Sequence, residues 1–197
     1  MLITEKKDLL QPFLKELEKN QPLQTELKEW LVNNFSILNI QKDEIILSEG
    51  ETCKYAWVVL NGIIRSFHYV GEAEVTSRLM TPYHIIISPE SFYTQTPAFE
   101  SLQALQPSVL ARLHYQQLDL LYQLFPSFNY VGRRLTEYYL FITERRLHLL
   151  RKQKATDKYK FFLEKYPDLI NEVPLKYIAS FLGINQETLS RVRRKIK

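Results

Sequence analysis

The amino-acid sequence predicts an α+β protein, in which a β-rich roll with flanking helices precedes a long helix and a C-terminal helix-turn-helix domain. Three observations predict it: short β-rich runs with turn residues between them, a proline-free stretch of helical period, and a helix-stop-cap-helix pattern at the end. We expect the roll with its helices over residues 1–126, the long helix over 127–152 and the last domain over 153–197.

The composition is that of an ordinary globular protein, with 45% hydrophobic residues in a chain of 197. No apolar run approaches the roughly twenty residues that a membrane helix needs. The first residues lack the basic-then-apolar order of a signal peptide. Cys53 is the single cysteine, which excludes a disulfide framework or a cysteine-based zinc site. We therefore expect a cytoplasmic protein with no membrane partner, metal or cofactor.

Residues 5–35 show apolar spacings of three and four, which predict helices that Pro12 and Pro22 break into short pieces. From Ser36 to Leu113 the sequence predicts short strands with tight turns between them, typical of a small barrel or roll. The pair Asn61-Gly62 is the strongest hairpin signal. The expected strands are Glu44–Leu47, Tyr55–Leu60, Ile63–Tyr69, Glu74–Leu79, His84–Ile87 and Val109–Leu113.

After a short helix over Gln116–Leu124, the proline-free segment Ser127–Lys152 predicts one long helix. Its apolar positions form a coiled-coil-like stripe that Arg145 interrupts. Such a stripe packs either inside the chain or across a dimer, and the pattern leaves both open. The candidate dimer residues are Phe128, Val131, Leu135, Tyr138, Ile142 and Leu149. A hinge over Lys152–Thr156 and a helix over Asp157–Tyr166 should follow.

The segment from Leu175 to Lys197 predicts two helices joined by a turn. Gly183 can take the left-handed conformation that ends the first helix, and Asn185 is a suitable N-cap for the second. The side chains expected to bury against one another are Ile178, Leu182, Ile184, Leu189 and Val192. The second helix then presents a hydrophilic face.

Positive charge is concentrated at this end of the chain. Residues 151–197 contain 12 Lys and Arg against 5 Asp and Glu, a net charge of +7, whereas residues 1–150 contain 14 and 17, a net of −3. A basic segment is usually a solvated surface. Because it coincides here with a helix suited to a DNA groove, it favours attraction to phosphates.

The order of elements resembles the Crp/Fnr superfamily of bacterial transcription regulators. The clearest resemblance lies in Leu175–Arg194 and in Glu44–Arg65, where Gly50 and Gly62 are similar to the family's turn glycines. The resemblance implies a cyclic-nucleotide-binding-like β-roll (a jelly roll), a dimerisation helix and a DNA-binding domain. It also implies homodimers on near-palindromic DNA, since a two-fold protein matches two half-sites, and a contact with RNA polymerase if the protein activates transcription.

The segment Glu187-Thr-Leu-Ser-Arg191 is similar to the family's recognition helix. The resemblance implies base contacts by Glu187, Ser190 and Arg191, and a phosphate contact by Thr188. Arg can donate twice to guanine, and Glu can accept from a cytosine amino group. Gln186 could reach a neighbouring base. Backbone contacts are expected from Arg193, Arg194 and Lys195. The alternative is an ordinary solvated helix.

Family members that bind cyclic AMP hold its phosphate with an Arg that follows a Gly-Glu pair. The corresponding segment here, Ser88–Ala104, contains neither Gly nor Arg. Glu90 falls near the Glu position, and the Arg position falls on Ala98 or Phe99. A buried phosphodiester would then lack charge-assisted contacts, so we expect no response to cyclic AMP.

The same segment contains Phe92, Tyr93 and Phe99, which together with Glu90 could line a pocket for an unknown small-molecule effector. Ordinary core packing is the alternative for the three aromatic residues. The sequence ends directly after the recognition helix, without the β-wing of many relatives, so fewer backbone contacts are expected.

No pattern points to catalysis. The histidines show no metal-ligand pair on a helix, and no nucleophile elbow or phosphate-binding loop occurs. The sequence therefore predicts a homodimeric, sequence-specific DNA-binding regulator and not an enzyme. The alternatives are a sensor whose output is protein contact, and a cyclic-nucleotide receptor with an unusual phosphate-binding segment.

Overall fold

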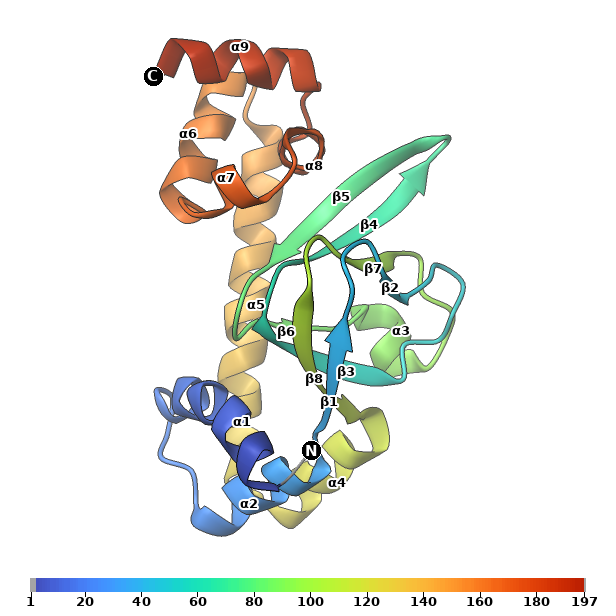
Figure 1. Cartoon of the computed structure of the whole chain (residues 1–197), viewed down its shortest axis with the longest axis vertical. Helices are drawn as coiled ribbons and strands as arrows, with labels where there is room; N and C mark the ends of the chain where they lie inside the picture. The colour runs from blue at the N-terminus through green and yellow to red at the C-terminus, as the bar shows by residue number, and fades with distance from the viewer. Residues whose placement is uncertain (1–2, 197) are drawn as a thin grey trace. The chain divides into compact units, whose positions relative to one another are not determined.

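The computed structural model describes residues 3–196 and contains helices and antiparallel strands (Figure 1). Lys197, the last residue of the predicted basic segment, lies outside the described residues. The elements are α1 (Ile3–Glu18), α2 (Thr25–Asn34), β1 (Ser36–Ile40), β2 (Ile45–Leu47), β3 (Tyr55–Asn61), β4 (Ile64–Val70), β5 (Ala73–Met80), β6 (Ile85–Ile86), α3 (Pro89–Thr94), β7 (Ser101–Ala104), β8 (Ser108–His114), α4 (Tyr115–Leu124), α5 (Phe128–Arg151), α6 (Ala155–Lys165), α7 (Leu169–Glu172), α8 (Leu175–Leu182) and α9 (Gln186–Ile196).

The chain forms two compact units. The first contains the described residues up to Ser66 together with Met80–Thr136. The second contains Phe67–Leu79, which is the outer part of the β4–β5 hairpin, together with the described residues from Glu137 onward.

The described strands form two four-stranded sheets, in the orders β1-β8-β3-β6 and β2-β7-β4-β5, of which Phe67–Leu79 of β4 and β5 belongs to the second unit. Side chains alternate between the two faces of each strand, so every second residue points into the roll. The inner faces meet in a core that includes Trp57, Val59, Ile64, Leu102 and Leu110. The prediction of an α+β chain with an antiparallel β-roll is therefore confirmed.

A second core lies on the outer face of the sheet that contains β3 and β8. Val58 and Ala111 point outward there and pack against helical residues such as Leu10, Phe13 and Leu27. Figure 1 shows α1, α2 and α4 gathered at this end of the unit.

The prediction that Pro12 breaks the first helix is wrong, because α1 continues through it. Pro12 is exposed, whereas Leu10, Phe13, Leu14 and Leu17 are buried along one stripe of the helix. The burial of each of these side chains contributes about 1.5–3 kcal/mol, which together exceeds the roughly 3 kcal/mol that an internal proline costs. Pro22 does separate α1 from α2.

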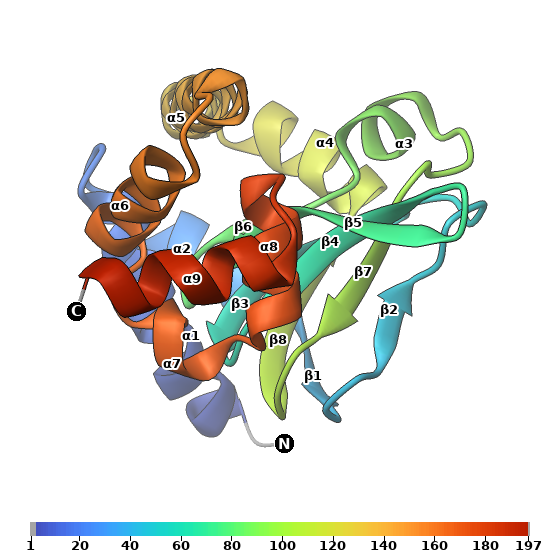
Figure 2. The same ribbon diagram turned by 90° about the horizontal axis from the view of Figure 1, so that it is seen from above.

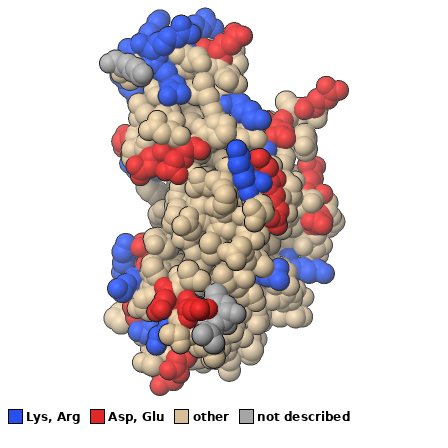
Figure 3. Space-filling view, in the orientation of Figure 1, with Lys and Arg blue, Asp and Glu red and all other residues tan. Residues whose placement is uncertain are grey.

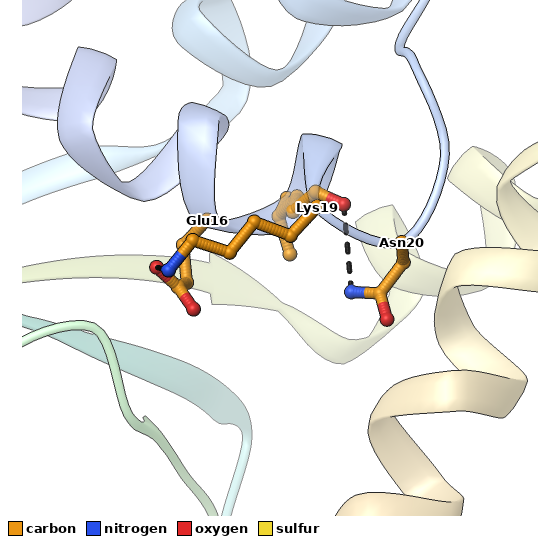
Figure 4. A network of polar contacts seen from close by, with 4 residues as sticks. Glu16, Lys19 and Asn20 are labelled. Carbon is orange, nitrogen blue, oxygen red and sulfur yellow. Dashed lines mark hydrogen bonds and ion pairs between the residues drawn. The ribbon is translucent and has the colours of Figure 1, made fainter.

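A small polar network closes the C-terminal end of α1 (Figure 4). Lys19 pairs with Glu16 across 2.6 Å, and the Asn20 side-chain amide donates to the Leu17 carbonyl at 3.5 Å. The ion pair is exposed, so we expect its contribution to stability to stay below about 1 kcal/mol.

The turn at Asn61-Gly62 is not the hairpin that the sequence predicts, because β3 and β4 belong to different sheets. Gly62 has a φ of 99°, and a Cβ at this position would lie 2.8 Å from the Ser108 Cα. Only glycine satisfies both conditions without strain. The actual hairpin joins β4 to β5 through Gly71 and Glu72.

In the second unit α8 and α9 pack on each other and on α6 (Figure 2). Phe162, Ile178, Leu182 and Leu189 are fully buried. The Phe181 ring lies 6.0 Å from the Phe162 ring and is part of the same core.

The connection between α8 and α9 has the conformation that the sequence predicts. Gly183 ends α8 with φ 59° and ψ 45°, and the Asn185 side-chain oxygen accepts a hydrogen bond from the Thr188 backbone N–H at 2.7 Å. Lys158, buried in α6, donates to the Gly183 carbonyl at 3.4 Å. A cation at the C-terminal end of α8 is favourable because the carbonyl dipoles point toward it.

Ser180 of α8 binds the edge of β5. Its hydroxyl accepts from the Thr76 backbone N–H at 2.8 Å and donates to the Glu74 carbonyl at 3.2 Å. One side chain therefore bonds two backbone groups of the outermost strand of its sheet.

Helices α4 and α5 approach closely at Gly132. A Cβ on this residue would lie 2.7 Å from Tyr122 Cε1 and would overlap its hydroxyl. We expect Gly132→Ala to lower the free energy of unfolding by about 1–2 kcal/mol, because the overlap outweighs the gain in helix propensity. Urea denaturation measures the change. In the Tyr122→Leu background the substitution should become nearly neutral; an equal cost there would contradict the close-approach argument.

Asn185→Ala removes the acceptor that caps α9. The expected loss is about 1 kcal/mol of unfolding free energy, since one backbone N–H of the first turn is left without its partner. Asn185→Ser keeps a capping oxygen and should lose less than half of that in thermal or urea unfolding. Equal losses for the two variants would show that the cap is not responsible.

Candidate nucleic-acid interface

One side of α9 is polar and accessible. Leu189 and Val192 are three residues apart and both buried, so they fix the inner side of the helix. The predicted contact residues lie around the remaining circumference. Gln186, Glu187, Arg191, Arg194 and Lys195 are exposed, and Thr188, Ser190 and Arg193 are partly buried.

The basic side chains of α9 have no acidic partner. Among the residues that the structure describes, no ion pair involves Arg191, Arg193, Arg194 or Lys195. Figure 3 shows Lys and Arg side chains gathered along this helix. Their charge is therefore available to an anionic partner, and phosphate groups interact well with such a surface.

Arg146 of α5 is a further cation of the second unit that the sequence analysis did not single out. Its guanidinium lies 3.8 Å from the centroid of the Phe181 ring in α8. Its Nε and Nη1 are buried without a hydrogen-bond partner among the described residues, and burial lowers the pKa of Arg146 to about 10. The group remains charged at neutral pH, and the aromatic ring provides its main contact.

The candidate effector residues do not converge on one pocket. Phe92 is buried in the core of the roll, as the core-packing alternative predicts. Tyr93 and Phe99 are 69% and 53% exposed, and Glu90 is also exposed. The expectation of a shared lining is corrected here: consecutive residues of α3 point in different directions, so Phe92 and Tyr93 cannot both face the interior.

The candidate dimer residues divide between the inside and the outside of the chain. Phe128 and Val131 are buried in the helical core, Leu135 packs against it, and Leu149 is also buried. These four side chains are packed within their own chain, which corrects their assignment to a dimer seam. Tyr138 remains exposed and Ile142 is partly buried. An apolar stripe has the same period in both situations, so the sequence did not separate them.

A different row of residues on α5 is open to solvent. Leu140, Leu147 and Leu150 are 69%, 51% and 41% exposed, and Thr143 lies between them on the same side. Their spacing of three, four and three residues is that of a coiled-coil seam. These leucines also stand at heptad spacing in the sequence, a few positions away from the predicted dimer residues.

Two classes of site have no candidate in the described part of the chain. No group of three or more His, Cys, Asp or Glu residues within 3–196 could hold a metal ion. No described helix combines the length and apolar character needed to cross a membrane.

Comparison with protein families matches residues 37–124 to the cyclic nucleotide-binding domain. The match covers the β-roll from β1 to α4. A comparison with curated proteins finds no match.

Solved structures with a similar fold include FixK2 from Bradyrhizobium japonicum, with 18% identity, a TM-score of 0.71, and coverage of 82% of this chain and 84% of that chain. CooA from Carboxydothermus hydrogenoformans, in a mutant form, has 16% identity, a TM-score of 0.70, and coverage of 93% and 83%. The Thermus thermophilus catabolite activator protein has 20% identity, a TM-score of 0.57, and coverage of 91% and 85%. Residues 37–124 thus match the cyclic nucleotide-binding domain, and the chain shares its fold with these solved structures.

Proposed function

We propose that this protein is a sequence-specific DNA-binding transcription regulator that acts as a homodimer, and that α8 and α9 are its helix-turn-helix motif. The observation that carries the proposal is the outward face of α9, where exposed Glu187 and Arg191 and partly buried Ser190 lie beside cations without acidic partners. A helix with this face suits the major groove of DNA.

Each side chain of the face has a chemically suitable role. Arg191 can donate two hydrogen bonds to guanine, Glu187 can accept from a cytosine amino group, and Ser190 can bond either kind of base edge. Gln186 and Thr188 lie in the first turn, where they can reach a neighbouring base or a phosphate. Contacts with the DNA backbone are proposed for Arg193, Arg194 and Lys195.

The similar structures support a regulatory role. They include a protein described as the global regulator CLP of Xanthomonas campestris, which links signalling to virulence gene expression. Another is the sensor domain of the transcriptional regulator DNR of Pseudomonas aeruginosa. We therefore infer a binding protein and not an enzyme, and a contact with RNA polymerase if the protein activates transcription.

The dimer is proposed to form through Leu140, Thr143, Leu147 and Leu150 of α5. Exposed leucines at heptad spacing gain stability when two helices bury them against each other. A dimer of this kind presents two α9 helices and so matches a near-palindromic site.

We infer that cyclic AMP is not the effector, although the matched domain is named for cyclic nucleotides. Segment 88–104 contains neither Gly nor Arg, and its aromatic residues do not enclose a common pocket. A sensor whose output is a protein contact remains the alternative function. Absence of DNA affinity at moderate salt would favour that alternative.

Arg191→Ala should reduce the preference for the specific site. We expect the preferred sequence to lose about 1–3 kcal/mol of binding free energy, while binding to random DNA changes little. Arg194→Ala is the matched control, because loss of a phosphate contact weakens both kinds of binding alike. Selection of sites from genomic fragments, followed by gel-shift titration, measures this. Salt-sensitive binding that ignores sequence and Arg191 would refute the proposed readout.

Leu147→Lys should convert the dimer to a monomer, because it places a charge in the centre of the proposed seam. Tyr138→Lys changes an exposed aromatic residue on another side of α5 and should leave the dimer intact. Sedimentation equilibrium of the full chain distinguishes the two. Dissociation by Tyr138→Lys alone would assign the interface to the other side of the helix.

A further inference from the structure

The C-terminal part of strand β8 places the guanidinium of Arg112 on the inner side of the roll. Arg112 shares its strand face with Leu110, which belongs to the roll core, and lies opposite Trp57 of β3. Ser36, its neighbour on β1, is exposed. Arg112 therefore stands where the core of the roll reaches solvent.

This guanidinium has no anionic partner. Among the described residues no carboxylate pairs with Arg112, and its Nε is buried without a hydrogen bond. Its guanidinium carbon lies 4.3 Å from the centroid of the Tyr55 ring. A cation in this situation gains strongly from an oxyanion, because an Arg fork matches the two oxygens of a carboxylate or phosphate.

A second donor lies beside it. His114 packs against the edge of Tyr55 with a centroid separation of 5.2 Å. The His114 Nδ1 accepts a hydrogen bond from the Gln116 backbone N–H at 3.4 Å. In the neutral ring the proton therefore resides on Nε2, which leaves this atom as a donor. Arg112 and His114 thus flank one aromatic ring.

We propose that Arg112 and His114 bind the terminal phosphate or carboxylate of a small ring-bearing molecule, with Tyr55 providing aromatic contact. The site is built on β3 and β8, and uses no residue of segment 88–104.

The site is connected to a helix. His114 is the N-cap of α4: its backbone N–H donates to Gln117 Oε1 at 3.1 Å, and the Gln117 amide donates to Asn34 at 3.1 Å. A ligand that binds His114 would therefore be coupled through these hydrogen bonds to the start of α4 and the end of α2. A regulatory effect of this ligand on DNA binding rests on the proposed function, whereas the binding of the ligand itself does not require DNA.

Isothermal titration calorimetry of the full chain tests the proposal with phenyl phosphate, benzoate, inorganic phosphate and neutral benzyl alcohol. We expect phenyl phosphate or benzoate to bind and benzyl alcohol not to bind. The comparison of the two anions decides between phosphate and carboxylate, and inorganic phosphate shows whether the ring contributes.

The same titrations use Arg112→Gln, with Arg133→Gln as the matched control. Arg133 also lies over a tyrosine ring, that of Tyr130 at 5.2 Å, but it is exposed on α5. We expect Arg112→Gln to weaken binding at least ten-fold and Arg133→Gln to leave it unchanged. If Arg112→Gln does not fold, Arg112→Lys decides, since it keeps the charge but loses the fork and should bind several-fold more weakly.

Three results would overturn the proposal: no binding of either anion at millimolar concentration, equal binding of benzyl alcohol, or binding that Arg112 substitutions do not change. Gel shifts on the same variants without ligand separate this outcome from failure of the proposed function, because they report DNA binding alone.

Discussion

The burial of Leu189 and Val192 beneath α6 and α8 is the constraint on which the functional interpretation depends. Because these two side chains occupy the inner side of α9, the outward direction of every other side chain on the helix is settled. Gly183 ends α8, and the Asn185 side chain caps the start of α9. Lys158 donates a hydrogen bond to the Gly183 carbonyl in the turn between them. A change in this turn would therefore rotate the polar face of α9 even though every residue of that face stayed the same.

The cations that lack an acidic partner among residues 3–196 lie in different surroundings. The α9 side chains are spread over a convex exposed surface, which suits a long polyanion. Arg112 is single, partly buried and placed over the ring of Tyr55, which suits a small anion. Arg146 differs from both, because its aromatic contact and burial leave little access to it. Burial, more than net charge, therefore separates their roles.

Features determined by neighbouring residues could be predicted from the sequence, and features determined by distant ones could not. The conformation of Gly183 and the cap at Asn185 depend on a few consecutive residues, and both predictions are confirmed. The Asn61-Gly62 turn was identified correctly as a turn, but β4 joins the other sheet, and Gly62 packs closely against Ser108, which is far along the chain. Arg112 appears unremarkable in sequence because its partner Tyr55 lies on another strand.

The apolar residues of α5 are a second feature that the sequence could not fully predict. Phe128 and Val131 have the spacing of a dimer seam, yet they fill the first unit's helical core. Leu147 and Leu150 have the same spacing, yet they are 51% and 41% exposed. Periodicity indicates that one side of a helix is apolar, but only the folded structure shows which residues pack against that side.

The two hydrogen bonds of Ser180 have a consequence for the behaviour of this protein at high concentration. The outermost strand of an open sheet carries backbone groups that can recruit a strand from another molecule, which is a common route to aggregation. By occupying the Thr76 N–H and the Glu74 carbonyl, the Ser180 hydroxyl protects that edge. Helix α8 therefore shields this edge of the sheet from pairing with a strand of another molecule.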